Sequence, residues 1–66
     1  MLFARFKFVE DNIKEVVTND CLVKIWLKTG EYFSCYHMPK AVQNFIKYMP
    51  NESFTDGKGD NHYIAK

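Results

Sequence analysis

Apolar and polar residues alternate on both sides of Thr29-Gly30. Residues 21–28 and 31–37 follow the two-residue period of strands, and a turn that contains glycine separates them, so the pattern predicts a β-hairpin. With a two-residue loop, Trp26 lies opposite Phe33, and Lys28 lies opposite Glu31, which are both favourable cross-strand pairs. A three-residue loop with Gly30 in the left-handed conformation shifts the pairing by one residue and exchanges the faces of one strand.

A helix is predicted directly after the hairpin. Pro39 suits the first turn of a helix, where the missing N–H costs nothing, and Pro50 stops it. Between them four apolar side chains recur at helical spacing, at Val42, Phe45, Ile46 and Met49. A helix of about three turns is marginal alone, so we expect this stripe to pack on the sheet. In the two-residue-loop register the matching sheet face is Val23, Ile25, Leu27, Tyr32 and Tyr36.

The rest of the chain adds one or two strands. Residues 2–9 alternate as a strand does, and residues 13–17 are ambiguous, although the β-branched run Val16-Val17-Thr18 favours a strand. Residues 50–61 are turn-rich and are expected to be irregular, and residues 62–64 add a short strand or simply dock. The predicted fold class is α+β: a single small domain over residues 1–66, an antiparallel three- to four-stranded meander with one helix packed on one face.

Composition narrows the classes of function. A net charge of +1 gives no overall bias toward nucleic acid or an anionic membrane. Two cysteines are too few for a disulfide scaffold, so we expect reduced thiols in an intracellular, cytoplasmic protein. Residues 1–9 contain Arg5 and Lys7 and are too short an apolar run for a signal peptide or a membrane span. A 66-residue chain buries only ~60% of its unfolded surface, which favours good packing or association.

Apolar, glycine and proline positions follow one another in a distinctive order over residues 13–49. They are Ile13 with Val16-Val17, the run Leu22-Val23-Lys24-Ile25-Trp26, Gly30 with Tyr32, Tyr36 with Met38-Pro39, and Val42 with Phe45-Ile46. In this order the chain resembles the small KTSC domain, which occurs as a stand-alone protein or at the C-terminus of some lysyl-tRNA synthetases. The resemblance implies the strand, turn, proline and helix arrangement, and it adds an RNA-associated role to the functions considered.

Candidate chemical groups are few. Cys35 and His37 lie on the same face of the predicted strand, and Cys21 and His62 would complete a four-ligand zinc set on paper. In the two-residue-loop register, however, Cys21 points to the helix side and Cys35 away from it. Residues at i and i+2 of a strand are ~7 Å apart, which is too far for a Cys35–His37 nucleophile and base.

In two polar segments, the residues are also not spaced as in a known binding or catalytic motif. Residues 56–61 lack the spacing of a phosphate-binding or calcium-binding loop, and we expect a solvated turn there. Glu10, Asp11 and Glu15 are interpreted as a solvated loop. The sequence therefore predicts no catalytic residue, no metal ligand and no cofactor, and we expect the protein not to be an enzyme.

The least ordinary feature is the hairpin face predicted to lie opposite the helix. A two-layer domain normally leaves that face polar, whereas this one carries an aromatic pair. Its predicted partner-binding residues are Leu22, Lys24, Trp26, Lys28, Phe33, Cys35 and His37.

Three kinds of molecule or segment are considered as the partner that covers this face. The first is the chain itself, through its Phe-rich first strand or the tail with Phe54, Tyr63 and Ile64. The others are another protein chain, or single-stranded nucleic acid stacked on the aromatics. We predict a small binding module that acts through protein–protein contacts and self-associates, an accessory regulator or inhibitor of the kind that phages encode. The alternative is a module that binds single-stranded nucleic acid or RNA, and no membrane partner is expected.

Overall fold

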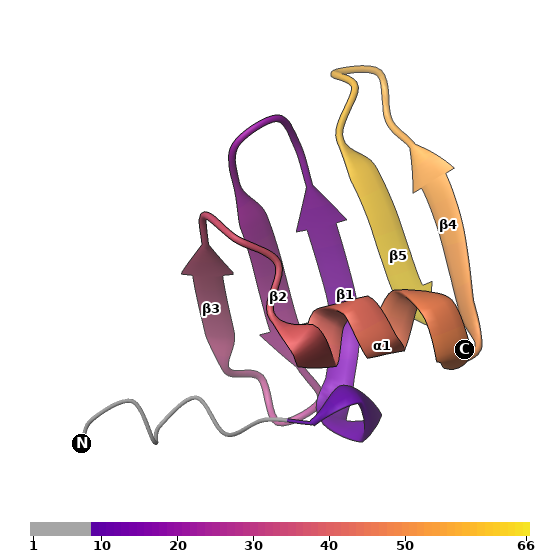
Figure 1. The fold of residues 1–66 in the computed structure, drawn as a ribbon. Helices are drawn as coiled ribbons and strands as arrows, with labels where there is room; N and C mark the ends of the chain where they lie inside the picture. The colour runs from indigo at the N-terminus through magenta and orange to yellow at the C-terminus, as the bar shows by residue number, and fades with distance from the viewer. Residues whose placement is uncertain (1–8) are drawn as a thin grey trace.

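The computed structural model describes residues 9–66, which form an α+β domain with a five-stranded antiparallel sheet and one α-helix (Figure 1). The strand order is β3-β2-β1-β5-β4. The prediction of an α+β fold with one helix is confirmed, but the sheet has more strands than predicted. The elements are the 3₁₀ turn η2 (Glu10–Asn12), β1 (Ile13–Thr18), β2 (Val23–Leu27), β3 (Tyr32–Cys35), α1 (Lys40–Tyr48), β4 (Asn51–Thr55) and β5 (Asn61–Ala65).

The β2–β3 hairpin has the three-residue loop. The N–H of Leu27 donates to the carbonyl of Glu31 at 2.9 Å, and the N–H of Gly30 donates to the carbonyl of Leu27 at 2.9 Å. Gly30 has a φ of 98°, which only glycine adopts freely, and this glycine completes the turn with the twist that the strands need. Trp26 therefore pairs with Tyr32, and Ile25 pairs with Phe33. The two-residue-loop register was wrong, and the alternative shifted by one residue is confirmed.

The core lies between α1 and the β1–β2 side of the sheet. Val42 and Phe45 are buried against Ile13, Ile25 and Leu27, with Ile46 and Met49 partly buried around them. The predicted helix stripe is confirmed. The predicted sheet face was half wrong, because Tyr32 points to the other side and Tyr36 is 79% exposed, while Phe33 and Cys35 pack against the core in their place.

The C-terminal segment is a second hairpin, so the prediction of irregular structure over residues 50–61 was wrong. β5 pairs with β1 on one side and with β4 on the other. Its loop repeats the geometry of the first hairpin. Asp56 N–H donates to Asp60 O, Gly59 N–H donates to Asp56 O, both at 3.0 Å, and Gly59 has a φ of 92°. β4 is a polar edge strand, Asn-Glu-Ser-Phe-Thr, and this is why its sequence shows no apolar run.

Two ambiguous segments are now assigned. β1 covers the segment for which the β-branched run favoured a strand, and β5 covers the short strand that was one of two readings of residues 62–64. The strand predicted over residues 2–9 falls outside the described residues, apart from Val9. Among residues 9–66, no helix is long and apolar enough to cross a membrane.

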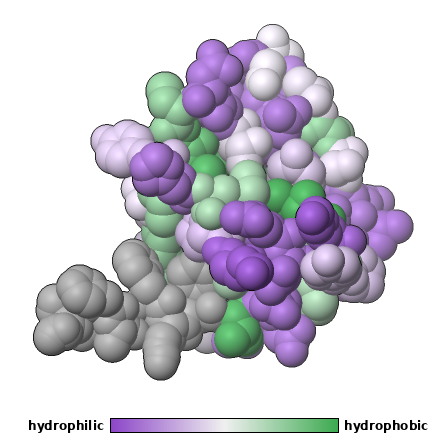
Figure 2. All heavy atoms as spheres, in the orientation of Figure 1, coloured by the Kyte–Doolittle hydropathy of each residue, from purple (hydrophilic) through white to green (hydrophobic). Residues whose placement is uncertain are grey.

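Asn51 joins the second hairpin to the helix. Its side-chain Nδ2 donates to the carbonyl oxygens of Met49 at 2.8 Å, Phe45 at 3.1 Å and Ile46 at 3.4 Å. These carbonyls lie at the end of α1, where helical N–H donors run out, and that of Phe45 also accepts from the N–H of Met49 at 3.2 Å. One amide therefore caps the helix and places the start of β4 beside it. Hydrophilic side chains gather over the outer surface of the helix (Figure 2).

Candidate binding surface

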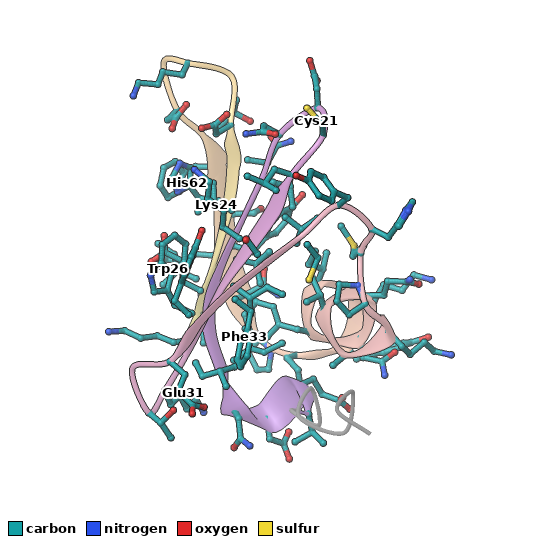
Figure 3. The ribbon with its side chains drawn as sticks, turned by 90° about the vertical axis from the view of Figure 1, so that its left-hand side faces the viewer. Cys21, Lys24, Trp26, Glu31, Phe33 and His62 are labelled. Atoms are coloured by element: carbon teal, nitrogen blue, oxygen red, sulfur yellow. The ribbon has the colours of Figure 1, made fainter. Side chains whose placement is uncertain are left out.

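The sheet has one face that α1 does not cover. Figure 3 shows Lys24, Trp26 and His62 on this side and the helix on the other. Because strand side chains alternate between faces, the registers place ten residues here, and we call this set the open face. Its first cross-strand row is Glu52, Ile64, Glu15, Trp26 and Tyr32, and its second row is Phe54, His62, Val17, Lys24 and Ser34.

An aromatic pair lies at the β2–β3 end of the open face. The ring centroids of Trp26 and Tyr32 are 5.0 Å apart, and the rings are tilted by 44°. Tyr32 is 49% exposed, and Trp26 is half-buried. Lys24 lies two residues from Trp26 on the same strand and face. Rigid aromatic rings with a polar edge are the side chains that contribute most to protein interfaces.

A histidine held by two carboxylates lies at the other end. His62 Nε2 is 2.8 Å from Asp56 Oδ2, and Nδ1 is 3.5 Å from Glu15 Oε2. The ring of Phe54 stacks on the imidazole at 4.6 Å, with an interplanar angle of 2°. The hydrogen bond to Asp56, with that to Glu15, raises the pKa of His62, and the hydrogen bond from His62 lowers the pKa of Asp56 to about 2.

The two carboxylates decide what the histidine does in the fold. Each ring nitrogen faces one of them, and a protonated imidazole donates from both nitrogens. His62 joins β5 to β1 through Glu15 and to the β4–β5 loop through Asp56. The group therefore stabilises one end of the open face.

The predicted partner-binding residues do not share one surface. Lys24 and Trp26 lie on the open face, whereas Phe33 and Cys35 pack against the core on the helix side, because the hairpin register is shifted by one residue. The other predicted residues lie outside the strands: Leu22 is half-buried before β2, Lys28 is exposed in the β2–β3 turn, and His37 is exposed after β3.

The cysteines are also placed differently from the prediction. Cys35 faces the core, and Cys21 is exposed in the turn between β1 and β2. Burial raises the pKa of the Cys35 thiol, which keeps it protonated and makes it a poor nucleophile. Within residues 9–66, no group of three or more His, Cys, Asp or Glu side chains is arranged to hold a metal ion.

Sequence reasoning missed the residues that complete the open face. Tyr32 belonged to the alternative register, so its position could be found from the same turn. Glu15 and Asp56 had been assigned to solvated loops. The contact of Asp56 with His62 depends on the β4–β5 hairpin, and that of Glu15 depends on β5 pairing with β1. Those two strands are separated by most of the chain, and no local pattern indicates their pairing.

Two hollows lined by described residues are both small. One, of about 240 Å³, is lined by residues of the β4–β5 hairpin, and the other, of about 210 Å³, lies beside α1 and is lined by Met38, Gln43, Ile46, Lys47 and Tyr63. Pockets for small-molecule ligands usually measure ~300 Å³ or more. The open face is therefore the better candidate for binding.

Comparison of the chain with protein-family models, with curated proteins and with solved structures finds no match. The resemblance to the KTSC domain stays a prediction.

Proposed function

We propose that this chain is a non-enzymatic binding module that contacts a protein partner through its open face. The observation that carries the proposal is the Trp26–Tyr32 pair on the sheet face opposite the helix. An uncovered sheet face of a small domain is normally polar, and an aromatic pair there indicates a contact surface. Trp and Tyr are the residue types most enriched among interface hot spots.

Charge on the open face favours protein over nucleic acid. Single-stranded nucleic acid is the second candidate, since bases stack on aromatic rings while Lys24 would meet a phosphate. Glu15 and Glu52 share a row with Trp26, however, and carboxylates repel a phosphate backbone. A surface of mixed charge around aromatic side chains is typical of protein interfaces.

The proposed role is that of an accessory regulator or inhibitor that works by occupying a partner's surface. We place it in a reducing compartment such as the cytoplasm. This location is supported by Cys21 and Cys35, which are both free thiols, with Cys21 exposed. Self-association is part of the proposal, because a small domain with an aromatic surface gains stability by covering it.

The test compares two double variants. Trp26→Ala with Tyr32→Ala removes the aromatic pair, while Tyr36→Ala with Tyr48→Ala removes two aromatics that are 79% and 74% exposed elsewhere. Circular dichroism checks that each variant folds. Crosslinking of the tagged chain in cells, followed by mass spectrometry, measures which proteins each variant contacts. We expect the first variant to lose partners that the wild type and the control retain.

Titration with single-stranded oligonucleotide separates the two candidates. Trp26 is the only tryptophan, so its fluorescence reports directly on the open face. Quenching that weakens steeply as salt rises would support nucleic-acid binding instead. Equal protein contacts for both double variants, with both folded, would contradict the proposed surface.

A further inference from the structure

Within residues 9–66 the sheet ends in two edge strands, β3 and β4, which differ in the residues that protect them. Edge strands expose backbone groups that another strand can pair with, and proteins usually block them with charge or proline. β4 contains Glu52 and directly follows Pro50. β3 is Tyr-Phe-Ser-Cys, and Glu31 directly precedes it. Within the strand itself, the β3 edge, which faces the viewer in Figure 3, carries neither a charge nor a proline.

The hairpin register shows which β3 backbone groups point outward. Leu27 and Glu31 close the hairpin with a hydrogen bond, and hydrogen-bonded and non-hydrogen-bonded pairs alternate from there. Phe33 is thus hydrogen-bonded to Ile25 in β2. Tyr32 and Ser34 form the non-hydrogen-bonded pairs with Trp26 and Lys24, so their N–H and C=O groups point away from the sheet.

We infer that β3 is a pairing edge for a second copy of this chain. The two β3 strands would lie antiparallel about a two-fold axis at Phe33, and Tyr32 of one copy would exchange both backbone hydrogen bonds with Ser34 of the other. The proposed function includes self-association that covers the open face, whereas this inference depends on the backbone of the β3 edge, and the experiment below separates the two surfaces.

Three features of the strand favour a second copy as the occupant. β3 carries no charge, so two copies meet without like-charge repulsion. The large side chain of Tyr32 would lie beside the small side chain of Ser34, which avoids a clash on the open face. The open faces of both copies would also lie side by side, with each Trp26–Tyr32 pair in one row with Ser34 and Lys24 of the other copy.

The experiment uses the same substitution at both edges. In Ser34→Pro the ring replaces an N–H that points outward, so pairing at β3 is blocked and no bond to β2 is lost. Ser53→Pro is the matched control. The Asp56–Asp60 closing bond places Ser53 in a non-hydrogen-bonded pair with Tyr63, so its N–H points outward from β4. Light scattering measures mass for the wild type and both variants.

We expect the wild type and Ser53→Pro to dimerise as concentration rises, and Ser34→Pro to stay monomeric. Pairing of such short strands is a small interface, so the series extends to ~1 mM, where weak association is still populated. Amide hydrogen exchange of the wild type tests the same pairing without any substitution, because it measures the protection of individual backbone amides. The amides of Tyr32 and Ser34 should become protected as concentration rises, and the amide of Ser53 should not.

Three results would overturn the inference. They are a wild type that stays monomeric throughout, a folded Ser34→Pro variant that still dimerises, and exchange at Tyr32 and Ser34 that does not depend on concentration. If the variant without Trp26 and Tyr32 side chains dissociates while Ser34→Pro does not, association runs through the open face. In that case the edge inference fails and the proposed function stands.

Discussion

Loss of the Asn51 side-chain amide should weaken the fold more than the small size of this group suggests. Replacing Asn51 with Ala removes the only side-chain donor that reaches the carbonyls of Phe45, Ile46 and Met49 among the described residues. Replacing it with Asp keeps the shape and exchanges the donor for a negative charge. That charge would lie at the negative end of the α1 dipole, beside carbonyls that it cannot bond.

The size of the effect follows from the geometry. The donor distances of 2.8 and 3.1 Å are those of good hydrogen bonds, and 3.4 Å is a weak one. The Phe45 carbonyl keeps the N–H of Met49 as a donor. Loss of the Asn51 donor from the carbonyls of Ile46 and Met49 costs ~1 to 3 kcal/mol, and the Asp charge adds roughly 0.3 to 1 kcal/mol. A domain of this length has a total stability of roughly 3 to 10 kcal/mol. Asn51→Asp should therefore remove a large share of it, and more than Asn51→Ala.

Urea unfolding followed by circular dichroism is the assay, with the free energy of unfolding taken from the midpoint at constant slope. Ser53→Ala is the control, because Ser53 is exposed in the same strand and its side chain makes no hydrogen bond with residues 9–66. That control should change stability by less than ~0.5 kcal/mol. The reasoning is refuted if Asn51→Ala and Ser53→Ala shift the midpoint equally, or if Asp is tolerated better than Ala.

Stability should also depend on pH through His62 and Asp56. Because the folded state raises the pKa of His62, its contribution is complete below the unfolded value of 6.5 and is lost as pH rises through the folded pKa. Because the pKa of Asp56 falls from 3.8 to about 2, its contribution is present above 3.8 and is lost as pH falls toward 2. Unfolding midpoints across pH should be highest between these limits, and His62→Gln should flatten the upper side while His37→Gln does not. In the β4–β5 loop, Gly59→Ala should lower the melting temperature because its φ of 92° strains any other residue, whereas Gly57→Ala should not lower it. An equal loss in both glycine variants would contradict this.

Local pattern was enough to predict the helix and the first two strands. A helix of this length is specified by the apolar stripe between two prolines, at Val42, Phe45, Ile46 and Met49. Helical spacing and helix-ending prolines are local signals, so they do not depend on where the helix packs. The β-branched run of β1 and the alternation in β2 are local in the same way. For the helix and β2, the sequence alone determined both the type of element and its buried side, whereas for β1 the pattern favoured a strand without deciding its face.

Tertiary structure decided the pairings, and with them the surface that we assign to binding. Both loop lengths at Gly30 satisfied the alternation of the hairpin, and the choice between them exchanged Phe33 for Tyr32 on the open face, because one residue of shift turns every side chain over. β4 is polar, and its strand forms only because β5 provides a partner. The joining of His62 to Glu15 likewise depends on β5 lying beside β1. Sequence therefore determined which segments are structured by their own periodicity, while contacts between distant segments decided which residues share a face.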